Sequence, residues 1–292
     1  MEDIIKYKNS FSTEAKLGFI GCGNMAFSIV KGLLQSKLFE ANEIIVSGTR
    51  DESFERLKSL GKINTTKNNN EVVRAAAIIF LCVKPAHLDA VAISLKKNFL
   101  NPDEIDLSNL NKTLVSILAG TSLNTLREAI PNFGSYIRVM PNTPLQVGAG
   151  CSAITIFNAS LDLLNSYNAV KAIFCSLGLV DVLDESKFHA ITALSGSGPA
   201  YVYIIIDALS DAGVKQGLPR DIATRFAAQT LLGASKTVLE SSFHVGQLKD
   251  QVTSSGGTTI HAIHELEKGG IRNTLFNAIE AATKRSKEMS EN

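Results

Sequence analysis

Short apolar runs alternate with amphipathic segments along the first half of this chain. The runs that predict strands cover residues 16–20, 43–47, 77–83, 113–117 and 136–140. The segments that predict helices run from the glycines after residue 20 to about residue 38, and over residues 51–59 and 71–76. Apolar strands that alternate with helices are typical of a parallel sheet covered on both faces. We therefore expect an α/β fold of the Rossmann type, with a doubly wound sheet.

Strand-like runs stop after about Asp184, and longer segments with helical spacing take over. The clearest of these cover residues 200–213, 220–239 and 258–268, and Gly-Pro and Leu-Pro pairs separate them. The pattern predicts a Rossmann domain over residues 1–184 and an all-helical domain over residues 185–292. A polar stretch at residues 96–112 is expected to be a surface loop or an insertion without a function of its own.

Composition narrows the classes of partner. The 292 residues carry a formal net charge of +1, include no tryptophan and are 7% aromatic, so a surface for nucleic acid is not expected. The longest apolar stretch, residues 202–209, is too short to cross a bilayer. Residues 1–15 contain acids and lack both the apolar core of a secretory signal and the arginines of a mitochondrial transit peptide. We expect a cytoplasmic protein that does not bind membranes.

The cysteines and histidines do not predict a metal site or a disulfide. The four cysteines (Cys22, Cys82, Cys151 and Cys175) form no CxxC pair, and each lies among apolar or small residues. We expect them to be reduced and at least partly buried. His261 and His264 are spaced to share a helix face, but no third ligand lies near them in the sequence.

A glycine-rich turn follows the first predicted strand and opens the first predicted helix. It reads Gly21-Cys22-Gly23-Asn24-Met25-Ala26, a GxGxxG pattern with alanine at its third position. Gly21 permits the tight turn, Gly23 lets the backbone approach a pyrophosphate, and Ala26 lets helix and strand pack closely. The free N–H groups of the helix then face the phosphates. The order strand, turn, helix favours a dinucleotide site over a merely structural turn.

The end of the second predicted strand distinguishes the two nicotinamide cofactors. NAD enzymes place an Asp or Glu there, which binds the ribose 2′-hydroxyl. This chain has Ser47-Gly48-Thr49-Arg50 instead, and the first carboxylate, Asp51, follows only after Arg50. Hydroxyls and a guanidinium suit a 2′-phosphate, so NADPH is favoured, with NADH as the alternative. The competing interpretation of Arg50 is a solvated loop residue.

A further turn, Cys82-Val83-Lys84-Pro85, follows the third apolar run, at the sheet edge where ligands of open α/β folds bind. Pro85 stiffens this turn, and its backbone groups can face a cofactor. Lys84 is either a proton donor or a surface lysine, and spacing alone favours the surface lysine.

Hydroxyls and glycines crowd together just before the predicted helix at residues 258–268. The stretch reads Gln251-Val252-Thr253-Ser254-Ser255-Gly256-Gly257-Thr258-Thr259. A helix N-terminus with free N–H groups is an anion site that suits a substrate carboxylate, and Thr259 can hydrogen-bond a nearby ring nitrogen. The alternative is an ordinary N-cap by Ser254, Ser255 or Thr258. The hydroxyls and glycines outnumber what a cap needs, which favours the ligand site.

In their order, these motifs resemble those of pyrroline-5-carboxylate reductase, the last enzyme of proline biosynthesis. The resemblance runs from about residue 16 to residue 287 and rests on residues 19–26, 83–85, 138–144 and 194–201. Its most specific block is residues 246–250 followed by residues 253–259. Many relatives have Pro in place of Ser255 and Ala in place of Thr258. Neither difference removes the backbone donors or Thr259.

The resemblance implies hydride transfer from NAD(P)H to the C=N carbon of 1-pyrroline-5-carboxylate, which gives L-proline. It implies that Thr259 is catalytic and bonds the imine nitrogen, and that homodimers form through the helical domains. Each active site is then built by two chains, and higher assemblies such as decamers are common. The implied substrate residues are Glu185, Ser254, Gly256, Gly257, Thr258 and Thr259. The implied cofactor residues are Ile20, Gly21, Cys22, Gly23, Asn24, Met25, Ser47, Arg50, Asn69, Cys82, Val83, Lys84 and Pro85.

Two other functions fit parts of the pattern. A dehydrogenase of small hydroxy or keto acids would use a catalytic lysine of the helical domain. The candidates, Lys187, Lys215, Lys236 and Lys249, lack a supporting motif. A non-catalytic dinucleotide sensor that dimerises through its helices is the alternative from a different class.

Overall fold

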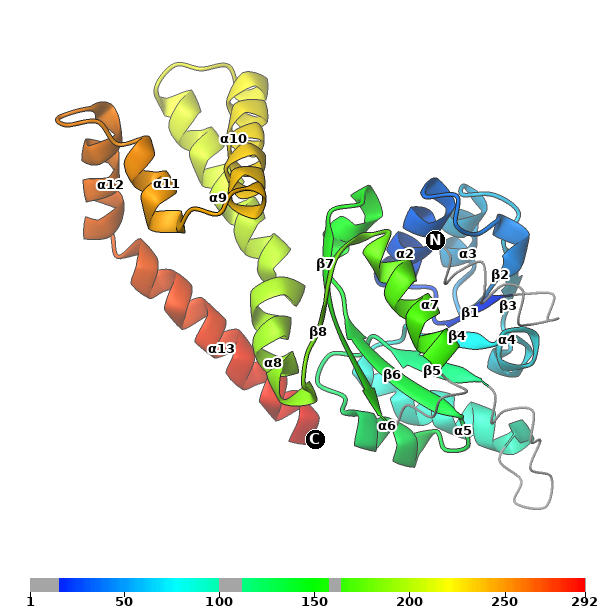
Figure 1. Ribbon diagram of the computed structural model, residues 1–292. Helices are drawn as coiled ribbons and strands as arrows, with labels where there is room; N and C mark the ends of the chain where they lie inside the picture. Colours follow the sequence, from blue (N-terminus) through cyan, green and yellow to red (C-terminus); the bar gives the residue numbers. More distant parts are fainter. Residues whose placement is uncertain (1–15, 100–111, 158–163, 292) are drawn as a thin grey trace. The chain divides into compact units, whose positions relative to one another are not determined.

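The computed structural model describes residues 16–99, 112–157 and 164–291, which pack as two compact units (Figure 1). The first, here called the sheet unit, ends at Gly196 and takes in the chain again from Thr283. The second, the helical unit, is Ser197–Ala282. We predicted a boundary between two domains at residues 184 and 185, and that domain division stays a prediction. In the structure the sheet unit extends past it, because the fully buried Phe188 packs its ring 4.8 Å from the Arg138 guanidinium of the sheet.

The sheet unit contains one sheet in the order β3-β2-β1-β4-β5-β6-β7-β8. The strands are β1 (Leu17–Ile20), β2 (Ile44–Ser47), β3 (Asn64–Thr66), β4 (Ile78–Leu81), β5 (Thr113–Ser116), β6 (Ser135–Met140), β7 (Gly150–Phe157) and β8 (Gly178–Val182). Neighbours pair in parallel except β6 and β7, which pair antiparallel. The first six strands follow the order typical of a Rossmann fold, as expected.

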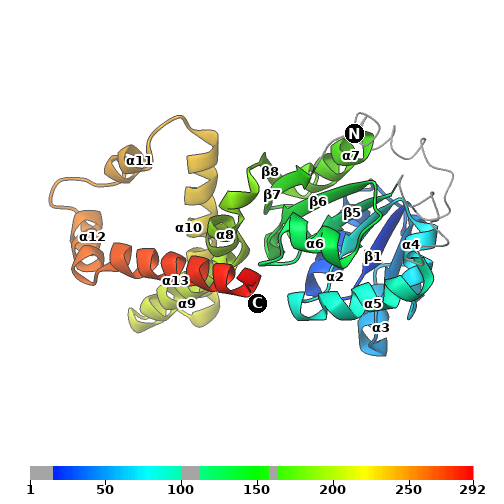
Figure 2. The same ribbon diagram turned by 90° about the horizontal axis from the view of Figure 1, so that it is seen from below.

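Helices cover both faces of this sheet (Figure 1; Figure 2). They are α2 (Asn24–Gln35), α3 (Asp51–Lys58), α4 (Asn69–Ala75), α5 (Leu88–Phe99), α6 (Leu123–Ala129) and α7 (Leu164–Cys175). Short turns of 3-10 helix lie at η1 (Ala41–Glu43), η2 (Pro85–His87), η4 (Thr143–Val147) and η6 (Glu185–Lys187). The prediction of a loop over residues 96–112 is wrong for residues 96–99, because α5 continues to Phe99. Residues 100–111 and 1–15, on which the rest of that loop and the targeting prediction depend, lie outside the described residues.

Each face of the sheet has its own hydrophobic core. On one face, α2, α3 and α7 cover a core that contains the stacked rings of Phe19 and Phe80, 4.8 Å apart, with Phe174 against Phe80. On the other face, α4, α5 and α6 cover a core around Ile79 and Leu114. Burying one such side chain contributes about 1.5–3 kcal/mol, so the two cores hold the strand ends rigidly.

The helical unit contains helices and turns only. After α8 (Phe188–Ile191) and the π-helical turn η7 (Thr192–Gly196), the chain forms α9 (Gly198–Lys215), α10 (Arg220–Glu240), α11 (Val245–Gln251), α12 (Thr258–Lys268) and α13 (Ile271–Glu291). This agrees with the expected helical second half. Among Ser197–Ala282, which the structure describes in full, only Ser210, Ala223 and Ala227 are buried. The unit by itself therefore has almost no core. No helix of the described residues is long and apolar enough to cross a membrane.

Candidate functional site

A cavity of about 630 Å³ opens in the sheet unit where β1, β2 and β4 end. Parallel strands with the Rossmann order bring these ends to one edge, which is where such folds bind dinucleotides. The residues that line the cavity are Ile20, Gly21, Cys22, Gly23, Gly48, Thr49, Arg50, Ser53, Lys67, Asn69, Cys82, Val83, Lys84, His87, Ala90 and Val91.

Glycines shape the floor of this cavity. Gly21 has a φ of 103°, and a Cβ there would lie 2.7 Å from the carbonyl oxygen of Cys82. A Cβ at Gly48 would lie 2.9 Å from the Cβ of Cys22. Gly23 differs, since the nearest atom to its added Cβ is 4.0 Å away, so the absence of a side chain there leaves open space in the cavity. The three glycines together let an extended ligand approach the backbone closely.

The start of α2 offers hydrogen-bond donors to such a ligand. Gly23 is its N-cap residue, and no side chain caps the helix. The first turn contains no acidic residue. Uncapped N–H groups and the helix dipole favour an anion, and a pyrophosphate fits both.

Asn69, at the start of α4, is held by a chain of side-chain hydrogen bonds. The buried Ser47 hydroxyl donates to Asn69 Oδ1 at 2.7 Å, and Asn69 Nδ2 donates to Ser94 Oγ at 3.0 Å. Ser94 in turn donates to the carbonyl oxygen of Val91 at 2.7 Å. The bonds link β2, α4 and α5, and they fix which end of the Asn69 amide carries the oxygen.

Cations gather near the glycine-rich turn. Burial raises the pKa of the Cys22 thiol, while the charges of Arg56 and Arg50 oppose that rise. Arg56 lies with its guanidinium 3.8 Å from the ring centroid of Phe27 and donates to Asn24 Oδ1 at 2.7 Å. Burial also raises the pKa of Cys82, so both cavity thiols stay neutral at physiological pH.

Nine of the thirteen residues expected to bind the cofactor line the cavity, and four do not. Ser47 is buried behind Asn69, the Asn24 side chain bonds Arg56, Met25 packs against the core, and Pro85 begins η2. Contacts from the backbone of Asn24 or Met25 stay a prediction. Lys84 lines the cavity and is exposed.

Several of the other residues that line the cavity carry no signal in the sequence that would select them. Lys67 comes from a turn that carries no motif, His87 lies two residues after the motif that ends at Pro85, and Ala90 and Val91 belong to α5. Thr49 and Ser53 extend the hydroxyl-rich segment at the end of β2. The strand pairing could have pointed to Lys67, because β3 lies beside β2 and its last residue, Thr66, pairs with Ser47.

The prediction that the cysteines are at least partly buried is wrong for one of the four. All four cysteines are free, but Cys175 is exposed, so its expected burial is wrong. Cys175 is the last residue of α7, where the helix leaves the core.

Within residues 16–99, 112–157 and 164–291, no group of three or more His, Cys, Asp or Glu side chains is placed to hold a metal ion.

The start of α12 has the features of an anion site. Its N-cap residue is Gly257 and no side chain caps it, so the alternative of a cap by Ser254, Ser255 or Thr258 is wrong. Gly256 has a φ of 67°, which shapes the turn before the helix and favours glycine. Within the described residues, the hydroxyls of Ser254 and Thr259 form no hydrogen bond. The N–H of Gly257 donates to the Ser254 carbonyl oxygen at 3.1 Å, but the N–H groups of Gly256 and Thr258 and these hydroxyls are available to a ligand.

Glu185 lies in the sheet unit, at η6, and has two partners there. Its Oε1 accepts hydrogen bonds from the Arg138 guanidinium at 2.8 Å and from the backbone N–H of Leu123 at 2.7 Å. The Arg138 side chain is only 3% exposed, and burial lowers its pKa while Glu185 opposes that change. The carboxylate thus ties β6 to the start of α6. Its expected contact with substrate stays a prediction.

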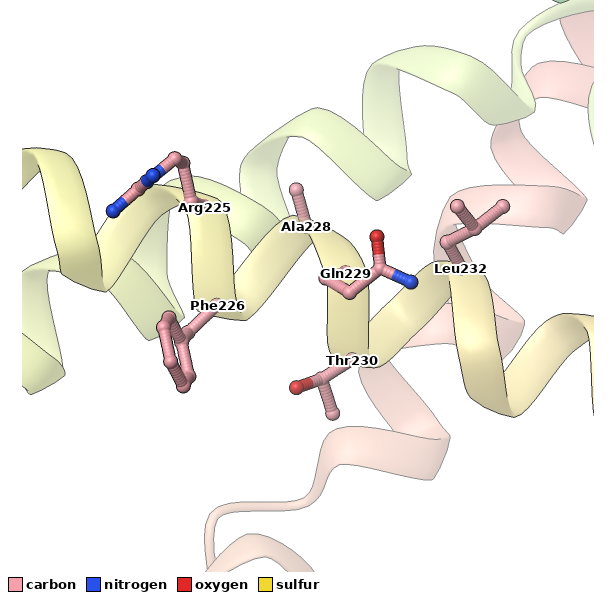
Figure 3. Close-up of a pocket in the computed structure, with 6 residues that line it drawn as sticks. All are labelled: Arg225, Phe226, Ala228, Gln229, Thr230 and Leu232. Carbon is pink, nitrogen blue, oxygen red and sulfur yellow. The ribbon is translucent and has the colours of Figure 1, made fainter.

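The helical unit presents large apolar side chains on its surface. Figure 3 shows a stretch of α10 with Phe226 and Leu232, which are 66% and 59% exposed. Ile204 of α9 and Leu239 of α10 are 70% and 76% exposed. Apolar surface on this scale, on a unit with almost no core, marks a protein interface.

Comparison with known proteins shows in which family these features occur together. A family model described as pyrroline-5-carboxylate reductase dimerisation matches residues 185–289, and one described as NADP oxidoreductase, coenzyme F420-dependent, matches residues 16–120. The pyrroline-5-carboxylate reductase of Pisum sativum is 44% identical over 94% of this chain and 96% of its own length. That of Synechocystis is 39% identical over 94% and 98%.

Solved structures agree with these relatives. The crystal structure of a pyrroline carboxylate reductase from Plasmodium falciparum with NADP bound has a TM-score of 0.81 and 32% identity, and covers 96% of this chain and 100% of that one. A pyrroline-5-carboxylate reductase from Coxiella burnetii has a TM-score of 0.81 and 33% identity, with the same coverage.

Proposed function

This chain belongs to the pyrroline-5-carboxylate reductase family, and we propose that it reduces 1-pyrroline-5-carboxylate to L-proline with a nicotinamide cofactor. The observation that carries the proposal is the uncapped start of α12, where Thr259 stands beside free backbone N–H groups. A small substrate with a carboxylate and a ring nitrogen matches those two kinds of group. A dinucleotide site in the same chain supplies the other requirement of a reductase.

The sheet-unit cavity fits a nicotinamide dinucleotide. Gly21, Gly23 and Gly48 leave room for the backbone to approach it, and the start of α2 suits its pyrophosphate. Among the described residues, no carboxylate lines the cavity, whereas Thr49 and Arg50 do. We therefore favour NADPH over NADH. When bound, the nicotinamide supplies the hydride that reduces the C=N carbon.

The start of α12 positions the substrate. We assign the carboxylate to the N–H groups at Gly256 and Thr258, with the Ser254 hydroxyl as a further donor, while Gly257 contributes its backbone shape as the N-cap residue. The Thr259 hydroxyl hydrogen-bonds the imine nitrogen and assists in delivering its proton. An iminium is a good hydride acceptor, so a strong general base is not required. Orienting the ring accounts for most of what these residues contribute.

A second copy of the chain covers the exposed apolar residues of the helical unit. Its few buried residues and the exposed Phe226, Leu232 and Leu239 support a homodimer through this unit. The variant Phe226→Glu is expected to weaken the dimer, because it desolvates a charge at the interface. Light scattering after size-exclusion chromatography measures this. The same experiment determines whether the dimers assemble further, for example into decamers.

The activity is tested by following oxidation of NADPH and of NADH by the purified chain with 1-pyrroline-5-carboxylate. The expected result is formation of L-proline in step with cofactor oxidation, with a higher kcat/KM for NADPH. Turnover of small keto acids without proline formation would instead indicate a hydroxy-acid dehydrogenase. Cofactor binding without any turnover would indicate a sensor. The cytoplasmic location stays a prediction for cell fractionation to test.

A further inference from the structure

Lys67 lines the cofactor cavity from a turn that the sequence motifs do not include. It lies between β3 and α4, two elements beside the end of β2. In Rossmann folds the end of the second strand is where the adenosine ribose binds. Lys67 thus reaches the same part of the cavity as Thr49 and Arg50, from a different element of the sheet.

The backbone on both sides of Lys67 is held in place. Thr66 Oγ1 accepts a hydrogen bond from the N–H of Asn68 at 3.0 Å and donates to Glu71 Oε2 at 2.5 Å. Asn68 caps α4 through a bond from the N–H of Asn70 to its Oδ1 at 3.0 Å. The turn that carries Lys67 is therefore anchored to a strand at one end and to a helix at the other.

The Lys67 side chain is paired with Asp51. The Lys67 ammonium lies 2.8 Å from Asp51 Oδ1, and Asp51, the first residue of α3, does not itself line the cavity. Both side chains are mostly exposed, at 63% and 79%. Water screens such a pair, so its net contribution to stability is small. The contact with Asp51 engages one of the three N–H donors of the ammonium, so the others are available to a ligand.

The carboxylate of Asp51 disfavours binding of a 2′-phosphate, and the ammonium of Lys67 offsets that effect. A carboxylate near the end of the second strand favours the ribose 2′-hydroxyl and repels a 2′-phosphate, which carries a charge of about −1.5 to −2. Lys67 offsets the charge of that carboxylate, so Asp51 no longer cancels the attraction of Arg50 for the phosphate. The ammonium donors that Asp51 does not use can form charge-assisted bonds to the phosphate.

We propose that Lys67 is a specificity-determining residue that, with Arg50, binds the 2′-phosphate of NADP(H), and that Asp51 holds its ammonium in position. This inference rests on the proposed function for the class of cofactor. It predicts that Lys67 acts on the 2′-phosphate and leaves the adenosine and the pyrophosphate unaffected.

The experiment is calorimetric titration of the full chain with 2′,5′-ADP and with 5′-ADP, which differ in the 2′-phosphate and need no turnover. In Lys67→Met the Kd for 2′,5′-ADP is expected to rise about tenfold, as for the loss of one charge-assisted bond, while the Kd for 5′-ADP stays unchanged. The matched control is Lys62→Met, because Lys62 is an exposed lysine of the same segment that does not line the cavity. It is expected to match the wild type.

Three results would overturn the inference. An unchanged Kd for 2′,5′-ADP in Lys67→Met means that the ammonium does not reach the phosphate. An equal loss for both nucleotides means that Lys67 acts on the fold or on the shared part of the ligand. Failure of the wild type to bind either nucleotide would contradict the proposed cofactor site as well, which separates that failure from the first two.

Discussion

The Ser47 hydroxyl donates a 2.7 Å hydrogen bond to Asn69 Oδ1, and this bond sets the orientation of a side chain in the wall of the cofactor cavity. Ser47 is fully buried at the end of β2 and so cannot itself meet a ligand in this structure. Its expected contact with the cofactor stays a prediction, and its hydroxyl lies against Asn69, which does line the cavity. Ser94 completes the arrangement from the other side of the amide.

Ser47→Ala is expected to weaken NADPH binding without abolishing it. The change removes one buried hydrogen bond, worth about 0.5–1.5 kcal/mol, and lets the Asn69 amide rotate. A rise in Kd of about threefold to tenfold should follow, measured by quenching of cofactor fluorescence. The control is Ser59→Ala, whose hydroxyl donates to the carbonyl of Arg56 outside the cavity. An unchanged Kd in Ser47→Ala would show that Asn69 needs no such support.

Gly21→Ala and Gly23→Ala are expected to fail in different ways. An alanine at Gly21 must adopt a φ of 103° with its Cβ 2.7 Å from the Cys82 carbonyl oxygen, so the fold itself is destabilised. An alanine at Gly23 meets its nearest atom at 4.0 Å and keeps the fold, but its methyl group occupies cavity space. Thermal denaturation with and without NADPH separates the two. Gly21→Ala should lower the Tm of the free protein, and Gly23→Ala should lose only the shift that NADPH causes. Equal Tm values for both free variants would contradict this distinction.

Glu185→Ala is expected to destabilise the sheet unit strongly. It leaves the Arg138 guanidinium, only 3% exposed, without its carboxylate, and removing one partner of a buried pair costs about 3–5 kcal/mol. Glu265→Ala is the control, since its ion pair with Lys268 is exposed at both ends and contributes about 0–1 kcal/mol. Urea denaturation measures both.

Kinetics of a further variant, Glu185→Gln, decide whether Glu185 also meets substrate. If it does, a Glu185→Gln protein that remains folded will show a raised KM for 1-pyrroline-5-carboxylate. If its role is only to tie β6 to α6, KM will stay at the wild-type value and only stability will fall.

The sequence predicted the parts of the fold whose signals are local. The apolar run before Gly21 and the small residues at Gly23 and Ala26 predicted β1, the turn and α2, because each residue type answers a nearby steric need. The helix at residues 258–268 matches α12 from its first residue to its last. By contrast, β3 is only three residues long and largely exposed, so its sequence lacks the apolar pattern of the central strands. β8 is also exposed at most positions, so its sequence lacks that apolar pattern too.

The site was less predictable where it depends on distant segments. Arg50 could be chosen because it lies only three residues after the last residue of the second strand. Lys67 enters the cavity only because β3 pairs with β2, and no local pattern reports that pairing. Likewise, Arg138 and Leu123 meet Glu185 from two other elements, so a carboxylate that we expected to contact substrate has structural partners that its own sequence does not reveal.

Thr259→Ala is expected to lower kcat while the Kd for NADPH stays unchanged. The hydroxyl is available to a ligand at the start of α12, and losing one transition-state hydrogen bond of about 1.5–3 kcal/mol reduces turnover by about tenfold to a hundredfold. Thr274→Ala is a matched control, because that hydroxyl, in the first turn of α13, donates to the carbonyl oxygen of Gly270 just before the helix. Wild-type kcat in Thr259→Ala would remove Thr259 from the reaction.

Recognition of the substrate carboxylate is tested most directly by comparing 1-pyrroline-5-carboxylate with 1-pyrroline, the same imine without its carboxylate, at saturating NADPH. The start of α12 is assigned to the carboxylate, and several charge-assisted bonds are lost with it. The predicted result is a kcat/KM lower by about a hundredfold or more for 1-pyrroline, with L-proline as the product of the full substrate. Comparable values for the two imines would contradict the assignment of α12 and with it the proposed way in which this chain recognises its substrate.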